Sequence, residues 1–282
     1  MRHWAILRFV VYVAILIAGR ILSAVATKPL IPPPAAPLHH ILLLICNLIS
    51  AALLLMLYTV AVRWLERRPV TELGPRQGAP RLLVGGLVGA ALMGVVYLAL
   101  WGFGAATFAP GTGLAGLGGG LAAAFAAAVL EELLLRAVLF RILEQVSGTT
   151  IAVVVSAAVF GLLHGLNPGA TPFSTAAIAL EAGVMLALAY ALTRNLWLAI
   201  GIHAGWNFTE GSLFGAAVSG GSEAHSLVRA SLSGPTWLTG GSFGPEASVV
   251  SVAVCLLLAG VLAYLILRQG GWRPRTFRLS LA

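Results

Sequence analysis

Long apolar segments dominate this sequence and restrict its fold more than any other feature. A helix needs about 20 mostly apolar residues to cross the hydrocarbon core of a bilayer. The chain has 282 residues, of which 59% are hydrophobic and only 9% are charged, a balance that soluble globular domains do not reach. We therefore predict an all-α, polytopic integral membrane protein with about eight transmembrane helices, at roughly residues 4–27, 39–62, 82–104, 119–146, 151–166, 173–193, 196–214 and 247–267.

Basic residues between these segments predict the orientation of the chain. If the N-terminus is cytoplasmic, twelve arginines fall on that side, and only Lys28 and Arg229 fall outside. This distribution obeys the positive-inside rule and favours an even number of spans with both termini in the cytoplasm. The net charge of +8 is spread between helices rather than gathered in a patch, so we expect contact with a lipid bilayer and no nucleic-acid partner.

The chain reads as a single membrane domain over residues 1–282, with a cytoplasmic tail at 268–282. The first apolar segment resembles a signal peptide, but Arg20 interrupts it, so we expect an uncleaved span. The Gly- and Ser-rich segment 215–246 has two interpretations, a lid or cap over the protein and a disordered loop. Gly85-x-x-x-Gly89 is a pattern typical of close helix packing.

Two adjacent glutamates and an arginine stand inside the fourth apolar segment, in "VLEELLLRAVLF" from Val129 to Phe140. A charged residue at the centre of a spanning helix costs about 2.5–3.5 kcal/mol, so this group needs compensation. Glu132 and Arg136 are four residues apart, so they share a helix face and can form an ion pair. Glu131 points about 100° away from that face. The pattern therefore makes Glu132 and Arg136 structural and leaves the Glu131 carboxylate available for chemistry.

Two later segments carry polar residues at one-turn spacing. "FGLLHG" places Phe160 four residues before His164, and "HAGWNF" places His203 four residues before Asn207. At a rise of about 1.5 Å per residue, both histidines, Asn207 and Glu131 lie about 10–20 Å from the inner ends of their helices. A carboxylate in a low-dielectric site can act as a general base, and histidine and asparagine donors can stabilise an oxyanion.

The motifs E-E-x-x-x-R, F-x-x-x-H and H-x-x-x-N, in successive predicted helices, resemble the CPBP family of CAAX proteases and bacteriocin-processing enzymes, also called the ABI family. The resemblance covers about 85 residues within the segment 119–214, and "NLWLAIGIHAGWNFTEG" is similar to the bacterial members. It implies an intramembrane endopeptidase with an eight-span helical core and a site buried between helices 4, 5 and 7.

The resemblance also implies roles for individual residues. Glu131 and His164 would activate a water for attack on the scissile carbonyl, and His203 and Asn207 would stabilise the oxyanion. The supporting residues would be Glu132, Arg136 and Phe160.

Zinc is the main mechanistic alternative, because one glutamate and two histidines can bind this metal and leave a position for water. Its ligands would be Glu131, His164 and His203. A metal-free glutamate mechanism is favoured for the eukaryotic CAAX enzyme, so we expect no cofactor here.

Two other classes of function fit parts of the pattern. One is a non-catalytic scaffold or bacteriocin-immunity-type protein of the same fold, which the four costly polar residues disfavour. The other is a proton-coupled transporter that uses Glu131, Glu132 and Glu181 as a relay, which the lack of an internal repeat disfavours. We interpret Glu181 as half of a structural ion pair, and Glu210 as a residue that can share a face with His203.

Other intramembrane protease chemistries are excluded by residue type. All nine acidic residues are glutamates, and the chain contains neither H-E-x-x-H nor G-x-S-G. High Ala, Leu, Gly and Arg content indicates a GC-rich bacterial genome and hence a bacterial plasma membrane. Because bacteria generally lack prenylated CAAX proteins, we expect a peptide precursor or a membrane protein as substrate.

Overall fold

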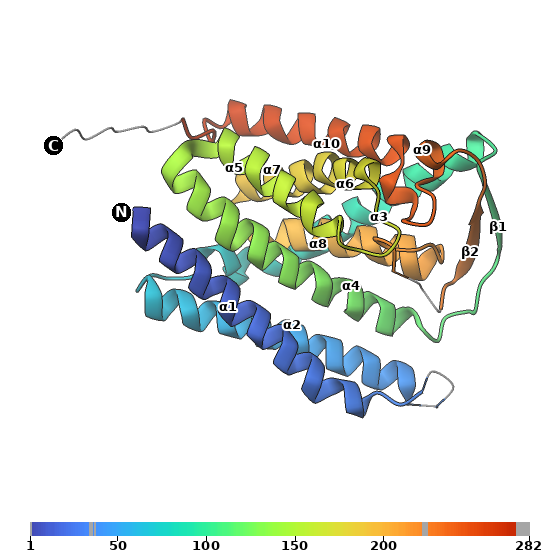
Figure 1. Ribbon diagram of the computed structural model, residues 1–282, viewed down its shortest axis with the longest axis horizontal. Coiled ribbons are helices and arrows are strands. Elements are labelled where there is room, and N and C mark those ends of the chain that lie inside the picture. The colour runs from blue at the N-terminus through green and yellow to red at the C-terminus, as the bar shows by residue number, and fades with distance from the viewer. Residues whose placement is uncertain (1, 34–35, 37, 222–224, 275–282) are drawn as a thin grey trace.

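The computed structural model describes residues 2–33, 36, 38–221 and 225–274, and most of them are helical (Figure 1). Three of the helical segments, η4, η5 and η6, are π-helical. The main elements, in chain order, are α1 (Arg2–Thr27), α2 (His39–Leu65), α3 (Gly78–Gly102), β1 (Ala106–Pro110), α4 (Leu117–Glu132), η4 (Leu133–Phe140), α5 (Arg141–His164), α6 (Pro172–Ile178), η5 (Ala179–Gly183), α7 (Val184–Thr193), α8 (Leu196–Phe208), η6 (Thr209–Leu213), β2 (Val228–Leu232), α9 (Thr236–Thr239), η7 (Pro245–Ala247) and α10 (Val249–Arg268).

Six helices of the described chain are long and apolar enough to cross a membrane. Many of their large apolar side chains face outward, among them Leu22, Leu87 and Leu257. Such a continuous apolar surface is incompatible with water and is what lipid contact requires. The protein is therefore a polytopic, mostly helical membrane protein.

The count of six differs from the predicted eight for two reasons. Segments 119–146 and 151–166 fall in one helical stretch, Leu117–His164, although Gly148 leaves helical geometry with φ 82° and ψ 172° and the chain turns back near it (Figure 1). Segment 196–214 forms α8 and the continuing η6, but it carries the polar residues His203, Asn207 and Glu210 and is not among the helices apolar enough to cross a membrane. Eight crossings therefore remain a prediction.

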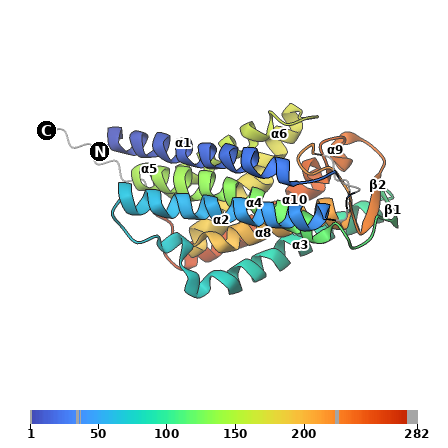
Figure 2. The same ribbon diagram turned by 90° about the horizontal axis from the view of Figure 1, so that it is seen from below.

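A small antiparallel sheet departs from the all-α prediction. β1 pairs with β2 so that Phe108 lies opposite Ala230, and both strands lie at one end of the helical bundle (Figures 1 and 2). Phe214 stacks on Tyr97 of α3 with ring centroids 4.0 Å apart, which ties this end to the bundle. The described parts of the segment 215–246 thus form a folded cap.

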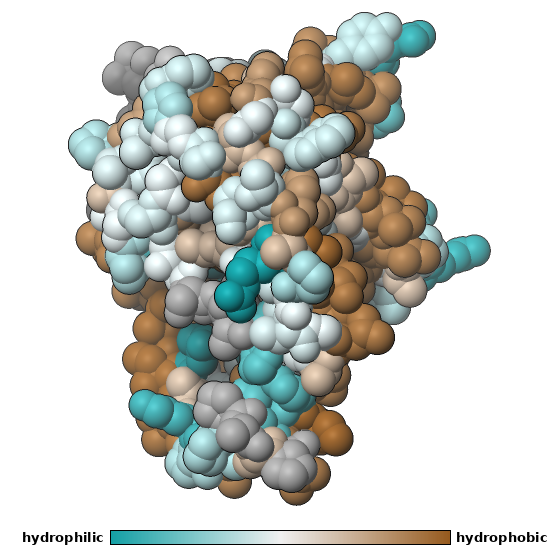
Figure 3. All heavy atoms as spheres, turned by 90° about the vertical axis from the view of Figure 1, so that its right-hand side faces the viewer, coloured by the Kyte–Doolittle hydropathy of each residue, from teal (hydrophilic) through white to brown (hydrophobic). Residues whose placement is uncertain are grey.

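The surface of the capped end differs from the flanks of the molecule. Figure 3 views this end and shows pale and teal residues over much of it, while brown, hydrophobic residues gather along its edges. This contrast is expected for an end that leaves the hydrocarbon core while the sides stay in lipid.

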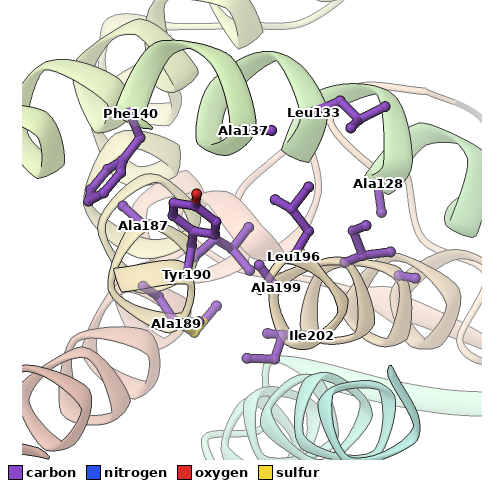
Figure 4. Packing of buried hydrophobic residues seen from close by; sticks show 14 of the residues in the cluster. Ala128, Leu133, Ala137, Phe140, Ala187, Ala189, Tyr190, Leu196, Ala199 and Ile202 are labelled. Carbon is purple, nitrogen blue, oxygen red and sulfur yellow. The ribbon is translucent and has the colours of Figure 1, made fainter. Parts of the chain in front are cut away.

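The interior of the bundle is built on small residues. α4 and η4 pack against α7 and α8 through alanines such as Ala128, Ala187 and Ala199, which are fully buried (Figure 4). Without a hydrophobic driving force in lipid, close backbone approach through small residues provides the packing energy between helices. Larger side chains fill the wider gap at the other end of this interface, where Phe140 meets Tyr190 edge to face at 5.5 Å.

α3 approaches α8 most closely, at glycines that include the predicted Gly85-x-x-x-Gly89 pair. A Cβ atom added to Gly89 would lie 2.0 Å from the carbonyl oxygen of Ile202, and one added to Gly205 would lie 2.1 Å from that of Gly86. Since His203 is the residue after Ile202, this contact also fixes the candidate site.

We expect Gly89→Ala to force the two helices apart, with a loss of about 1–3 kcal/mol of stability. The matched control is Gly94→Ala in the same helix, because a Cβ there meets nothing within 4 Å and alanine favours the helix. Thermal unfolding of both variants in one detergent tests this. Equal midpoints for the two variants would show that the close approach is not required.

An ion cluster closes the end of the bundle opposite the strands, where α1 begins and α10 ends (Figure 1). The Glu66 carboxylate, at the end of α2, accepts hydrogen bonds from Tyr12 Oη at 2.8 Å and from Arg141 Nη2 at 2.6 Å. Arg68 Nε adds a third contact at 2.7 Å. Glu66 therefore joins α1, α2 and the start of α5.

The pH dependence of stability should reveal this cluster. Burial alone would raise the pKa of Glu66, but hydrogen bonds from Arg141 and Arg68 outweigh it and lower the pKa to about 2. A carboxyl with a lowered folded-state pKa stabilises the fold above its unfolded pKa and loses that contribution as the pH falls toward the folded value. We expect the stability difference between wild type and Glu66→Gln to be constant above about pH 4.5 and to shrink toward pH 2. Urea unfolding of both proteins in detergent across this range checks it, and a difference that grows on acidification would contradict it.

Candidate functional site

The two glutamates lie where α4 ends and the π-helical η4 begins. Glu132 is fully buried, whereas the side chain of Glu131 is 29% exposed, so adjacent residues face different surroundings as their spacing predicts. π-helical segments are rare and occur frequently at functional sites. The local geometry thus presents one carboxylate inward and the other toward a cavity.

The inward carboxylate is the centre of a buried network. Arg136 Nη1 donates to Glu132 Oε1 at 3.1 Å, so the predicted pair forms, and both side chains are fully buried. His203 Nδ1 lies 3.0 Å from the same oxygen, a contact that helical spacing alone does not predict. Arg136 Nη2 also donates to the carbonyl oxygens of Ala182 and Gly183 at 3.1 and 3.2 Å. Glu132 and Arg136 therefore fix α8 and η5 against η4.

Phe160 packs between the charged and the imidazole groups. The Arg136 guanidinium lies 4.7 Å from the centroid of its ring, a cation–π contact. The His164 ring also stacks on the Phe160 ring, with centroids 4.5 Å apart and an interplanar angle of 20°. The predicted supporting role of Phe160 thus has a physical basis, because its ring restricts the plane of His164.

The two histidines direct the same atom toward Glu131. His164 Nε2 lies 3.7 Å and His203 Nε2 lies 3.8 Å from Glu131 Oε2. These distances exceed a direct hydrogen bond, and the Glu131 oxygen is buried without any hydrogen-bond partner among the described residues. A buried carboxylate oxygen without a partner is rare in folded proteins, and one water could contact all three atoms.

The tautomer of His164 follows from its second ring nitrogen. Nδ1 lies 2.9 Å from the carbonyl oxygen of Phe160, and a carbonyl can only accept, so Nδ1 carries the hydrogen. In the neutral imidazole, Nε2 then offers a lone pair toward Glu131. This nitrogen can accept a proton or a hydrogen bond from a water.

Asn207 lies beside these groups, on the wall of a small enclosed cavity of about 20 Å³. His164 and His203 line the same cavity, whereas Glu131 lines a different one together with His164, so three of the four candidate residues share this wall. The other walls come from elements across the fold; the remaining lining residues are Phe160, Ile178, Glu181, Ala182, Met185, Leu186, Trp206, Ser219, Glu246 and Cys255.

Two buried carboxylates line this cavity, those of Glu181 and Glu246. The contacts of Glu181 differ from the interpretation based on the sequence, and no role was predicted for Glu246. Glu181 forms no ion pair with the described residues; its Oε2 lies 4.0 Å from Cys255 Sγ. The structural-pair interpretation of Glu181 is therefore wrong, because no cation of the described chain reaches it. Glu246 is the last residue of the cap segment 215–246, where no periodicity indicates which residues turn inward.

A second cavity, of about 180 Å³, lies in front of Glu131. Leu163, on its wall, is half exposed, so this cavity lies near the outer surface of α4 and α5. It is lined by Glu131, Leu135, Phe160, Leu163, His164 and Asn167.

The positions of the possible ligand atoms bear on the zinc alternative. Zinc requires its ligand atoms at about 2.0–2.2 Å in a tetrahedral arrangement. Among the described residues, no group of three or more histidine, cysteine or glutamate side chains is placed to hold a metal ion. The Nε2 atoms of His164 and His203 nevertheless face Glu131 Oε2 at 3.7 and 3.8 Å, so the zinc alternative stays a prediction that chelation tests.

One family match covers the helices that carry these residues. Residues 113–209 match the family described as type II CAAX prenyl endopeptidase Rce1-like. No curated protein matches the chain. The matched residues run from just before α4 to the first residue of η6 and contain the four candidate residues, while α1 to α3 and α10 lie outside. Residues 113–209 are therefore similar to the Rce1-like type II CAAX prenyl endopeptidase family.

Proposed function

We propose that this protein is a glutamate-dependent intramembrane endopeptidase that hydrolyses a peptide bond with a water held by Glu131 and His164. The observation that carries the proposal is the partnerless Oε2 of Glu131, which faces the Nε2 atoms of both histidines at 3.7 and 3.8 Å. A general base must lie within reach of the proton it removes, directly or through one water. The family match of residues 113–209 supports the same reaction class.

The reaction balances with the residues present. Glu131 accepts one proton from the water as the water oxygen bonds to the carbonyl carbon, which gives a tetrahedral oxyanion. As the carbon–nitrogen bond breaks, the proton passes from Glu131 to the leaving nitrogen. The products are a carboxylic acid and an amine. His164 accepts a hydrogen bond from the water through Nε2 and orients it.

The role of His203 requires its protonated form. Its Nδ1 faces the Glu132 carboxylate at 3.0 Å, so the hydrogen of a neutral ring resides there and Nε2 has only a lone pair. A lone pair cannot stabilise an oxyanion, whereas the imidazolium donates from both nitrogens. We assign the oxyanion contact to the His203 imidazolium and the Asn207 amide. Glu132 then holds two cations, His203 and Arg136.

The position of the second cavity, in front of Glu131, indicates the class of substrate. Its wall includes Leu135 and Leu163, so an extended peptide can enter between α4 and α5 from the lipid side. A peptide precursor or a segment of a membrane protein meets this requirement. We place the termini and the charged end of the bundle on the cytoplasmic side, following the distribution of arginines.

Cleavage by the purified full-length protein in nanodiscs tests this function. The panel contains farnesylated CAAX peptides, unmodified peptides of the same sequence and short single-span membrane peptides. We expect wild type to cut at least one of them and to keep its rate after treatment with a strong chelator. Loss of the rate on chelation with recovery on added zinc would contradict the metal-free reaction.

A further inference from the structure

The enclosed cavity behind the candidate site has the size and the chemistry of a water site. Its volume of about 20 Å³ holds about one water and is too small for a side chain. A buried water needs two to four polar partners. The wall offers Asn207 on the site side, and Glu181, Ser219 and Glu246 on the far side.

Glu246 is the lining residue whose hydrogen bonding is incomplete. The residue is 3% exposed, and its Oε1 is buried without a partner among the described residues. A buried polar atom without a partner destabilises the fold, so the atom calls for an explanation such as a water that it contacts. Burial raises the pKa of the Glu246 carboxyl, which favours the protonated form, and this form both donates and accepts.

The chain holds Glu246 in place from several sides. Its backbone N–H donates to Glu210 Oε1 at 3.2 Å, and Glu210 is itself fully buried. One residue earlier, the Pro245 carbonyl oxygen accepts from Ser251 Oγ at 2.7 Å. Two residues later, Ser248 caps the start of α10. The turn therefore carries a carboxyl group into the protein and fixes it there.

His164 lies between this enclosed cavity and the second cavity, in front of Glu131. The His164 and Phe160 side chains line both spaces, so a water in the enclosed cavity lies on the side of the imidazole away from the substrate. From these positions we infer that Glu246 is a positioning residue for proteolysis, which acts through a water in the enclosed cavity to orient Asn207.

This inference rests on the proposed function and adds a residue to it. Glu246 does not contact the substrate or the attacking water. A bridging water is nearly as favourable as a direct hydrogen bond, so it can fix the Asn207 amide, which has no other hydrogen bond with the described residues. The role should therefore appear in kcat and leave KM nearly unchanged, because orientation matters most in the transition state.

Three variants of the full-length protein in nanodiscs test the inference on the peptide that wild type cleaves fastest. Glutamine at position 246 retains a donor and an acceptor, so we expect Glu246→Gln to stay within about threefold of wild type. Leucine retains the volume without polar atoms, so we expect Glu246→Leu to lower kcat by about 10- to 100-fold with KM within about twofold. Ser219→Ala removes another lining hydroxyl and should lower kcat by a smaller factor.

Two controls separate positioning from stability. Thermal unfolding of Glu246→Leu on the same preparation separates a lower kcat of the folded protein from a loss of folded protein. Glu144→Gln, at another buried carboxylate that lies outside both cavities, should leave kcat nearly unchanged.

The inference is overturned if Glu246→Leu and Ser219→Ala both keep wild-type kcat, or if Glu246→Gln is as slow as Glu246→Leu. An experimental density map that shows the cavity dry would overturn it independently of kinetics. Activity of wild type with loss in Glu131→Gln would, in each case, leave the proposed function standing.

Discussion

Peptide cleavage falls by about 10²- to 10⁴-fold when Glu131 is replaced by glutamine, if this carboxylate is the general base. The amide has nearly the same shape but cannot accept the proton of the attacking water. Since Oε2 of Glu131 has no protein hydrogen bond to lose, the unfolding midpoint of the variant should match wild type. Measurement of kcat/KM and of thermal unfolding on the same preparation tests both statements.

The matched control for Glu131→Gln is again Glu144→Gln. Glu144 interacts with Arg194 and Thr149 and lies outside the cavities around the site. The control should retain activity within about threefold. If the two variants were equally active, or if Glu131→Gln lost activity only in proportion to its loss of folded protein, Glu131 would not be the base.

Removing one partner of the buried ion pair should destabilise the protein by about 3–5 kcal/mol. Arg136→Met leaves the Glu132 carboxylate in a fully buried site with only His203 opposite it. The variant also loses the hydrogen bonds from Arg136 to the carbonyl oxygens of Ala182 and Gly183. Thermal unfolding in detergent and the yield of folded monomer measure this loss.

The double variant Glu132→Gln/Arg136→Met provides the comparison. It removes both charges, so we expect it to recover part of the stability that Arg136→Met loses. Its activity should remain low, because the His203 imidazolium would no longer face a carboxylate through Nδ1. A double variant less stable than the sum of the two single changes would contradict a mutual ion pair.

Helical periodicity accounts for the parts of the site that lie on one helix. The spacing of Glu132 and Arg136 predicts their pairing, and the angle between adjacent residues separates Glu131 from them. Contacts between helices are less predictable, since they depend on rotation as well as depth. Depth alone places His203 near Glu131, but the hydrogen bond from His203 Nδ1 to Glu132 depends on how α8 rotates against η4.

The membrane spans and the cap contain features that sequence patterns do not predict. Apolar length predicts the helices but not their breaks, because Gly148 is one of 33 glycines and nothing in the pattern distinguishes its positive φ. β2 alternates apolar and polar residues over its five positions and pairs with β1 where the helix ends bring the two together, but β1 itself has no such period. Glu246 is missed for the same reason, since a loop has no period from which an inward-facing residue can be read.

The most direct test of the central claim is mass analysis of the cleavage products formed in water enriched with heavy oxygen. The account predicts one heavy oxygen in the new carboxyl terminus from wild type, and no such product above background from Glu131→Gln at equal folded protein. Equal amounts of labelled product from both proteins would show that another group activates the water, and unlabelled product would show that water does not attack the peptide carbonyl.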